Sequence, residues 1–262
     1  MTTTLQKDLA SHLLACEENV QDTVKVTKEM APDLTIEEAY LVQEQLVQMK
    51  LDKGLTIVGP KMGLTSKAKL TQMNVDEPIY GYVFSNMVHD NKSQVSMKEL
   101  IHPKVEAEIA FELGEDMEGP GVSAADVMRA TAAFIPAVEI IDSRYKNFEF
   151  TLPDVIADNA SSSKVVFGER VPNQQDLELD LLGATITIND EVKAGGAGAA
   201  VLGHPANAIA MLVNMLAKKG EKLKKGQIIL SGAITEAILA ETGDQIGVSI
   251  DQLGEVKFSF ID

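Results

Sequence analysis

The sequence predicts a single α+β domain, in which an N-terminal helical layer (residues 1–54) packs on a mixed β core (residues 55–262). Apolar residues recur at helical spacing through the first fifty residues, whereas from residue 55 onward short apolar runs alternate with turns. The composition is that of an ordinary globular domain, with 45% hydrophobic and 24% charged residues. No internal repeat or Pro- or Ser-rich linker divides the chain, so we expect one domain rather than two.

Four helices are predicted from capping residues and helical spacing. Thr35 and Glu38 form a capping box, and Pro205 is typical of a first helical position. Gly220 follows the expected end of that last helix. The predicted helices cover residues 5–18, 35–54, 123–133 and 205–219.

Strands are predicted where short apolar runs are bounded by turns or alternate with polar residues. The run 105–111 alternates cleanly, so Glu106 and Glu108 face one side and apolar residues face the other. The run 134–141 is interrupted by Pro136 near its start. Further strands are predicted at residues 55–59, 164–167, 184–188, 227–230, 245–250 and 256–260.

The charge and cysteine content restrict the partners. The chain has 39 acidic and 23 basic residues, and its net charge of -16 disfavours nucleic acid and anionic membranes. No apolar run approaches the roughly 20 residues needed to cross a bilayer, and no signal-peptide pattern is present. The single cysteine, Cys16, excludes an intramolecular disulfide and a thiolate zinc cluster. We expect a cytoplasmic protein whose anionic substrate, if it has one, is attracted by a local cation.

Glu106 and Glu108 are candidate metal ligands. Residues two apart on a strand share a face, which brings their carboxylates within several ångströms of each other. Two such charges repel unless a cation or a shared proton lies between them. The competing interpretation is a solvated outer strand face, which is the commoner setting for an isolated pair of this kind.

Glu139 is the third candidate ligand. It lies in an apolar run (residues 137–141), where a lone carboxylate needs a partner to stay charged. Three carboxylates without histidine or thiolate suit a hard, oxygen-preferring ion, Mg²⁺ or Mn²⁺. The alternative is a core glutamate in a salt bridge, with Arg144 as its partner.

Two further segments could line a site. Lys61 directly follows a predicted strand, where it could bind a carboxylate or transfer a proton, or simply be a surface lysine. The polar cluster 158–162 could be a pocket loop or a plain turn.

Six short segments carry a combined pattern: KMGLTS at 61–66, PIYG at 78–81, HPKVEAE at 102–108, VEIIDSRY at 138–145, ADNAS at 157–161 and GAAVLGHP at 198–205. Together they resemble the decarboxylase and hydratase group of the fumarylacetoacetate hydrolase superfamily, from about residue 35 to the C-terminus. The resemblance implies a mixed β-sandwich or roll core with flanking helices. It also implies a metal held by Glu106, Glu108 and Glu139, in agreement with the spacing.

The resemblance further implies a carboxy-lyase of aromatic meta-cleavage, which converts 2-oxo-3-hexenedioate to 2-hydroxypenta-2,4-dienoate and CO₂. The segments KMGL, HPK and VLGHP favour this decarboxylase branch over the hydratase branch. On this basis Lys61 and Ser161 are expected to be catalytic. Leu64, Asp158 and Ser231 are expected to bind the substrate.

Other activities stay open at this point. A hydratase would use the same metal site to add water to the dienoate, and an acylpyruvate-type hydrolase would need a water poised for C–C cleavage. The resemblance also implies a homo-oligomer and a complex with the pathway hydratase, for which the chain could serve chiefly as a scaffold. An intact cluster of like charges argues against a scaffold alone.

Overall fold

The computed structural model describes residues 3–73, 75–173 and 177–262, and its strands form two sheets. The strands of the first sheet are β1 (Ile57–Gly63), β2 (Ile79–Phe84), β3 (Val88–Asp90), β5 (Lys104–Leu113), β6 (Thr131–Ile141), β7 (Ser162–Phe167), β8 (Val171–Pro172), β11 (Ile228–Ala233) and β12 (Ile238–Leu239). Its order is β2-β1-β11-β5-β6-β7-β3, with β12 beside β5 and β8 beside β6. This sheet is mixed, because β1 runs parallel to β11 whereas β5 and β6 are antiparallel.

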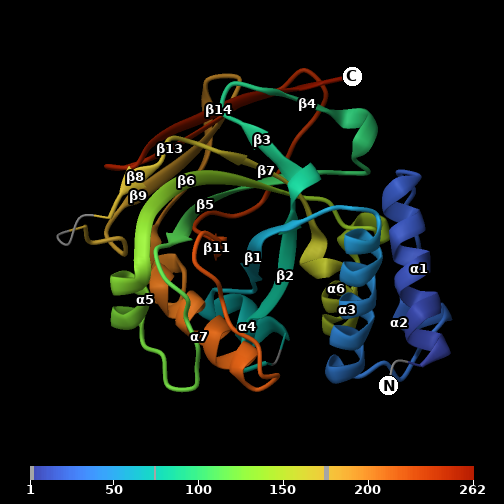
Figure 1. Ribbon diagram of the computed structural model, residues 1–262. Coiled ribbons are helices and arrows are strands. Elements are labelled where there is room, and N and C mark those ends of the chain that lie inside the picture. The colour runs from blue at the N-terminus through green and yellow to red at the C-terminus, as the bar shows by residue number, and fades with distance from the viewer. Residues whose placement is uncertain (1–2, 74, 174–176) are drawn as a thin grey trace.

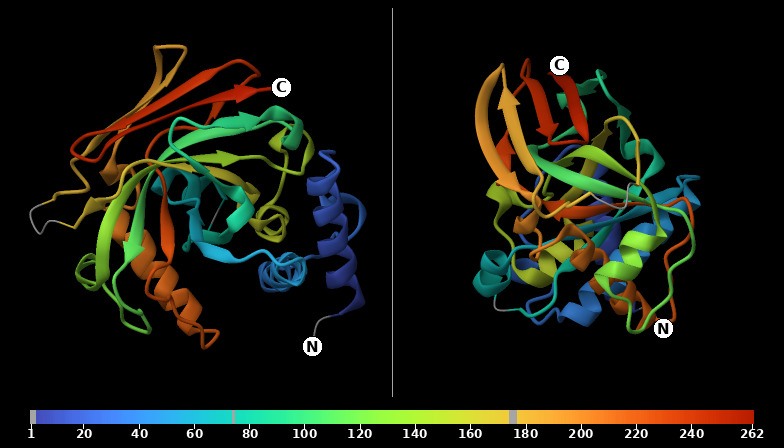
Figure 2. Two further views of the ribbon diagram at one scale, coloured as in Figure 1. Left: turned by 45° about the horizontal axis from the view of Figure 1, so that its top comes forward. Right: turned by 90° about the vertical axis from the view of Figure 1, so that its left-hand side faces the viewer.

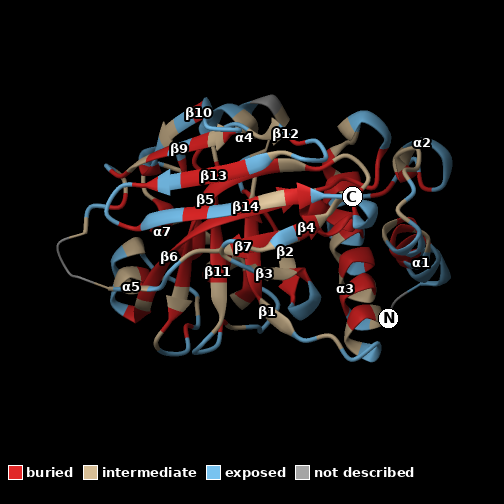
Figure 3. Cartoon of the chain, turned by 90° about the horizontal axis from the view of Figure 1, so that it is seen from above, coloured by how far each residue is buried: buried red, intermediate tan, exposed pale blue. Residues whose placement is uncertain are grey.

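The second sheet has the order β10-β9-β13-β14-β4 and lies across the first (Figures 1 and 2). Its strands are β4 (Gln94–Ser96), β9 (Gly183–Ile188), β10 (Glu191–Ala197), β13 (Gln245–Ile250) and β14 (Gly254–Ile261). Its strands alternate between buried and exposed residues, so one face meets the core and the other faces solvent (Figure 3).

Seven α-helices flank the sheets within the described residues (Figure 1). They are α1 (Thr4–Glu18), α2 (Val26–Glu29), α3 (Ile36–Asp52), α4 (Lys67–Met73), α5 (Ala124–Ala130), α6 (Leu152–Ala157) and α7 (Pro205–Ala217). Short 3₁₀ turns occupy Ser85–Met87, Met97–Glu99, Lys146–Phe148, Asn159–Ser161 and Gly198–Ala200. The predicted α+β class with a mixed β core is confirmed.

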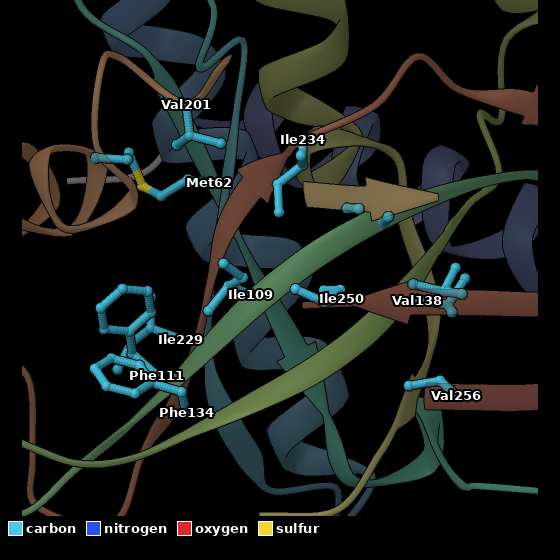
Figure 4. Packing of buried hydrophobic residues seen from close by; sticks show 14 of the residues in the cluster. Met62, Ile109, Phe111, Phe134, Val138, Val201, Ile229, Ile234, Ile250 and Val256 are labelled. Atoms are coloured by element: carbon cyan, nitrogen blue, oxygen red, sulfur yellow. The ribbon is translucent and has the colours of Figure 1, made fainter. Parts of the chain in front are cut away.

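The alternation of β5 determines what each of its faces meets. Ile109 of β5 and Val138 of β6 pack in one buried cluster with Ile250 and Val256 of the second sheet (Figure 4). The opposite face of β5 is also covered, because Ala110 packs in a separate buried cluster with residues of α3, β2 and β7. The glutamates that share this second face are therefore inside the molecule, and the interpretation of a solvated outer face is wrong.

The N-terminal helices pack side by side and against α6 (Figures 1 and 2). Their apolar stripes form a buried cluster with residues from β2 and α6. The side-chain amide of Gln43 on α3 donates hydrogen bonds to the carbonyls of Tyr80 and Ile156, at 2.9 and 3.0 Å. Because these carbonyls are buried, the bonds hold α3 in one position against β2 and α6.

Helix α7 corrects one expectation. The segment Gly198–Ala217 is long and apolar enough, by length and composition alone, to cross a membrane, so the statement that no such run exists is wrong. Half of its most apolar window is buried inside the fold, and α7 packs on β11 and β1. Eight of the thirteen residues of α7 are buried, which accounts for much of its hydrophobicity.

Several predicted boundaries were also wrong. Helix α5 ends at Ala130 instead of continuing to residue 133, because the Thr131 hydroxyl bonds the Val127 carbonyl and the chain enters β6. Pro136 lies in the middle of β6, where the strand changes its partner from β7 to β8, a place that tolerates a missing N–H. The elements that were not predicted are α2, α4, α6, β2, β3, β4, β8, β10 and β12.

Candidate active site and metal centre

Strands β5 and β6 bring the three predicted ligands together. Glu106 and Glu139 are directly opposite each other in the antiparallel ladder, and Glu108 lies two residues along the same face. One carboxylate oxygen from each residue lies within 4.8 Å of the others, and all three side chains are buried. Three carboxylates at this separation, out of water, repel one another strongly.

Nearby groups offset this repulsion only in part. The Lys61 ammonium lies 3.0 Å from Glu139 Oε1, and the Lys69 ammonium lies 3.5 Å from Glu106 Oε1. The Gly232 N–H donates to Glu108 Oε2 at 2.8 Å. Among the described residues, Glu108 Oε1 and Glu139 Oε2 have no hydrogen-bond partner. Buried carboxylate oxygens without partners are costly, so the cluster is suited to bind something more.

Titration behaviour follows from this environment. Burial raises the pKa of Glu108 well above its ordinary value of 4.5, and the nearby charge of Glu139 raises it further. The pKa of Glu139 is also raised by burial, although Lys61 opposes the shift. Burial would lower the pKa of Lys61, but the charges of the glutamates outweigh it and raise that pKa. Lys61 is therefore a fixed cation in this site.

The donor set fits a divalent oxygen-seeking ion. Glu106, Glu108 and Glu139 offer hard carboxylate oxygens, two of which have no other partner in the described structure. This group of candidate metal ligands, drawn from the described residues, contains no histidine or thiolate. Mg²⁺ and Mn²⁺ prefer such ligands, whereas zinc prefers nitrogen and sulfur.

Lys61 lies inside a strand, not at the end of one. Strand β1 runs through Pro60 to Gly63, so Lys61 pairs with Gly81 of β2 on one side and with Leu230 of β11 on the other. Its side chain is only 3% exposed, which excludes the surface-lysine interpretation. The Lys61 ammonium also donates to the Ala160 carbonyl at 3.1 Å, so its position is set by two partners.

The 3₁₀ turn Asn159–Ser161 has a strained backbone. Its three residues have φ values of 50°, 52° and 55°, which lie in the left-handed region that residues other than glycine seldom occupy. Asn159 holds the loop, because its side chain exchanges two hydrogen bonds with the backbone of Tyr82. Gly81 permits this approach, since a Cβ there would lie 2.4 Å from the Asn159 carbonyl oxygen. The buried Ser161 hydroxyl has no hydrogen-bond partner among the described residues.

Ser231 and Leu64 lie near the same strand ends. Ser231 is fully buried on β11, and its hydroxyl has no partner within the described parts of the chain. The next residue, Gly232, binds Glu108 and has φ +110°, and a Cβ there would meet Thr65 Oγ1 at 2.1 Å. Leu64 follows β1 with φ +57°. Backbone with positive φ therefore adjoins Glu108 at Gly232 and Lys61 at Ala160, as it often does at functional sites.

Asp158 has a different partner from the one a substrate pocket would give it. Both of its carboxylate oxygens accept hydrogen bonds from Arg144, and this ion pair is buried. The remaining Arg144 donors bind the carbonyls of Asp142, Ser162 and Asp158. The interpretation of Glu139 as the salt-bridge partner of Arg144 is wrong, because Lys61 takes that place.

Sequence reasoning missed Lys69 and Gly232. Gly232 could have been found from the Ser-Gly pair that ends the apolar run 228–230, since a glycine there permits a positive φ. Lys69 carries no such signal, because it lies on a short helix that was not predicted and reaches Glu106 only through the tertiary fold.

Comparison with known proteins identifies the family of the chain. Residues 56–261 match the family described as fumarylacetoacetate (FAA) hydrolase C-terminal. The chain is 45% identical to a 4-oxalocrotonate decarboxylase of Pseudomonas sp. (strain CF600), with 100% of both chains covered. It is 40% identical to 2-keto-4-pentenoate hydratase 1 of Dechloromonas aromatica (strain RCB), over 85% of this chain and 84% of that one.

A solved structure gives the same result. The 4-oxalocrotonate decarboxylase from Pseudomonas putida G7, complexed with magnesium and adipate, superposes with a TM-score of 0.95 at 44% identity. The match covers 98% of this chain and 97% of that one. The chain therefore belongs to the fumarylacetoacetate hydrolase family, within the group that contains the 4-oxalocrotonate decarboxylases and the related hydratases.

Proposed function

We propose that this protein is a carboxy-lyase that converts 2-oxo-3-hexenedioate (4-oxalocrotonate) to 2-hydroxypenta-2,4-dienoate and CO₂, with Mg²⁺ or Mn²⁺ as its cofactor. The observation that carries the proposal is the buried cluster of Glu106, Glu108 and Glu139, with carboxylate oxygens that lack partners among the described residues. End-to-end similarity to 4-oxalocrotonate decarboxylases supports the choice of reaction.

The reaction needs a place for an electron pair. When the C5–C6 bond breaks and CO₂ leaves, the pair moves along the conjugated chain and the charge collects on the C2 oxygen. A divalent ion held by the three glutamates would supply the Lewis acid that stabilises this charge. Protonation of that oxygen then completes the dienol product.

The surrounding side chains have roles that follow from their positions. Lys61 is a buried cation fixed by Glu139 and Ala160, so we assign it to orient the substrate or to deliver the proton to the C2 oxygen. The hydroxyls of Ser161 and Ser231 are buried without a described partner, and we assign them to hydrogen bonds with substrate oxygens. Leu64 would contact the carbon chain of the substrate.

Asp158 keeps a supporting part in this proposal. Its carboxylate is occupied by Arg144, and it directly precedes the strained loop that carries Ser161. We therefore assign Asp158 to hold that loop in place, and through it the binding pocket.

The second candidate function is a hydratase of the dienoate. It is favoured by the 40% identity to a 2-keto-4-pentenoate hydratase, whose match covers most of both chains. Both reactions would use the same three glutamates, so the site alone does not separate them.

We also propose that the protein acts in the cytoplasm, forms homo-oligomers and associates with the pathway hydratase. Exposed large apolar side chains support such contacts, among them Leu181 and Val192. Light scattering after size-exclusion chromatography, with and without the hydratase, measures both associations. A monomer that does not change mass on mixing would contradict this part.

A paired assay tests the reaction. Purified protein with Mg²⁺ or with EDTA is given 2-oxo-3-hexenedioate in one cuvette and 2-hydroxypenta-2,4-dienoate in the other, and ultraviolet absorbance and CO₂ are followed. We expect metal-dependent CO₂ release from the first substrate. Loss of dienoate absorbance without CO₂ release would instead identify a hydratase. No reaction in either cuvette would favour the role of a scaffold for the pathway hydratase.

A further inference from the structure

Lys69 is a second cation at the glutamate cluster, and it differs from Lys61 in exposure. The Lys61 side chain is 3% exposed and is engaged by Glu139 and the Ala160 carbonyl. The Lys69 side chain is 42% exposed, projects from α4, and contacts the cluster only at Glu106 Oε1, at 3.5 Å. Lys69 therefore borders the site from its solvent side and is free to change partner.

The charges of the site explain what that partner would be. Three carboxylates, Lys61 and a divalent ion balance to zero, so a bound ion removes the reason for Lys69 to stay with Glu106. A dianionic substrate then adds two negative charges inside a protein whose net charge is -16. The end of the substrate that chelates the ion would lie against a cation, whereas the far carboxylate would need a cation of its own.

We propose that Lys69 is the specificity residue for the distal carboxylate of the substrate, and that it exchanges Glu106 for this carboxylate when metal and substrate bind. The inference rests on the proposed function, because only a diacid substrate presents a carboxylate at that end. Lys69 would thereby distinguish diacids from the monoacids on which a hydratase of the dienoate acts.

This role is one of binding and not of chemistry. The bond to the distal carboxylate breaks during decarboxylation, so an ion pair that stabilises its charge favours the bound substrate and does not favour its loss as CO₂. Replacement of Lys69 should therefore raise KM for the diacid and leave kcat nearly unchanged.

The test compares two inert ligands by isothermal titration calorimetry of the Mg²⁺-loaded protein. 2-Oxoadipate and 2-oxohexanoate share the C1 carboxylate and the C2 oxo group, and only the first has a distal carboxylate. A charge-assisted hydrogen bond to that group corresponds to roughly tenfold or more in affinity. We expect the wild type to prefer 2-oxoadipate by about this factor, and the Lys69→Met variant to bind both ligands alike.

Two variants and one control measurement sharpen the result. Lys69→Arg should keep most of the preference, and so should Lys67→Met, which removes an exposed charge from the same helix. Mg²⁺ affinity should not weaken in Lys69→Met, because a cation near the ion has been removed.

Three outcomes would overturn the proposal. A wild type without preference for the diacid would do so, as would a Lys69→Met variant that retains the preference. The third outcome is a Lys69→Met variant that binds Mg²⁺ more weakly and loses affinity for both ligands equally. It would show that Lys69 acts by holding Glu106 in place. Binding of inert ligands needs no turnover, so a failure of the decarboxylase assay stays distinguishable from a failure of this inference.

Discussion

Two groups of buried charge in this molecule have opposite characters. Arg144 and Asp158 form an ion pair in which both carboxylate oxygens accept hydrogen bonds and the guanidinium reaches three backbone carbonyls. The glutamate cluster has three carboxylates, one buried lysine and oxygens without partners in the described structure. The first group is complete within the chain, whereas the second is complete only with a cation.

The difference separates a structural charge from a functional one. The charge of Asp158 outweighs burial and keeps the pKa of Arg144 above its ordinary value, whereas burial raises the pKa of Asp158 to about 6 although Arg144 opposes it, so the pair is ionised at neutral pH. At Glu108 burial is joined by the like charge of Glu139, so its pKa is raised well above the ordinary value even though Lys61 lies nearby. A fold that retains such an unfavourable arrangement indicates a functional site.

The largest effect is expected when the glutamate cluster loses one of its carboxylates. Glu106→Gln removes one carboxylate and keeps the shape of the side chain. If the ion contributes several kcal/mol to the transition state, kcat/KM should fall roughly a thousandfold or more. The fold should persist, and circular dichroism and thermal unfolding in EDTA check this. Full activity in Glu106→Gln would remove the metal-site assignment.

Removing one partner of the Arg144–Asp158 ion pair should instead lower the free energy of unfolding. Arg144→Leu leaves the Asp158 carboxylate buried without its partner, and we expect a loss of about 3–5 kcal/mol in the free energy of unfolding. Urea denaturation measures it. The matched control is Arg170→Leu, which breaks a half-exposed pair with Glu112 and should cost no more than about 1 kcal/mol. Equal losses in the two variants would contradict the structural role.

Metal should stabilise the wild type and not the Glu106→Gln variant. Mg²⁺ at a hundred times its dissociation constant should add about 2.7 kcal/mol to the free energy of unfolding, because the unfolded chain does not assemble the three carboxylates. Urea denaturation with Mg²⁺ and with EDTA gives the difference. An equal gain in both proteins would place the ion elsewhere.

Metal affinity should also depend on pH. The raised pKa of Glu108 means that a proton competes with the ion at pH values above the ordinary carboxyl range. Mg²⁺ should therefore bind more tightly as pH rises through that pKa. Without metal, the free energy of unfolding should change in the opposite direction. It should decrease as pH rises over the same interval, because the folded chain keeps a proton that the unfolded chain has lost. Affinity that does not change between pH 5 and 8 would contradict this account.

The smallest effect on stability is expected at Ser231. Its hydroxyl is buried without a described partner, so Ser231→Ala breaks no hydrogen bond and should change the free energy of unfolding by less than about 1 kcal/mol. If the hydroxyl binds substrate, kcat/KM should fall about tenfold. Steady-state kinetics beside urea denaturation separates the two effects, and unchanged kinetics would remove Ser231 from the site.

Local patterns predicted one half of this site, and long-range geometry determined the other. Strand alternation placed Glu106 and Glu108 on one face, because a period of two needs no knowledge of the fold. The cross-strand pairing of Glu106 with Glu139 depends on register between distant segments, which spacing does not determine. The partner of Lys69 has the same origin, since Lys69 reaches Glu106 on a separate element.

The fold shows the same division. Capping boxes at Thr35 and Ser123 located the starts of α3 and α5, because a cap is a local hydrogen-bonded motif. The extension of β1 through Pro60 and Lys61 was missed, because tertiary pairing with β2 and β11 overrides the usual effect of proline.

The most direct test of the central claim is a count of bound metal. Mn²⁺ binding, measured by electron paramagnetic resonance against free Mn²⁺, should give one ion per chain that Mg²⁺ displaces, and this binding should be lost in Glu106→Gln and Glu139→Gln. A wild type that binds no ion, or variants that bind it with unchanged affinity, would contradict the assignment of the three glutamates as its ligands.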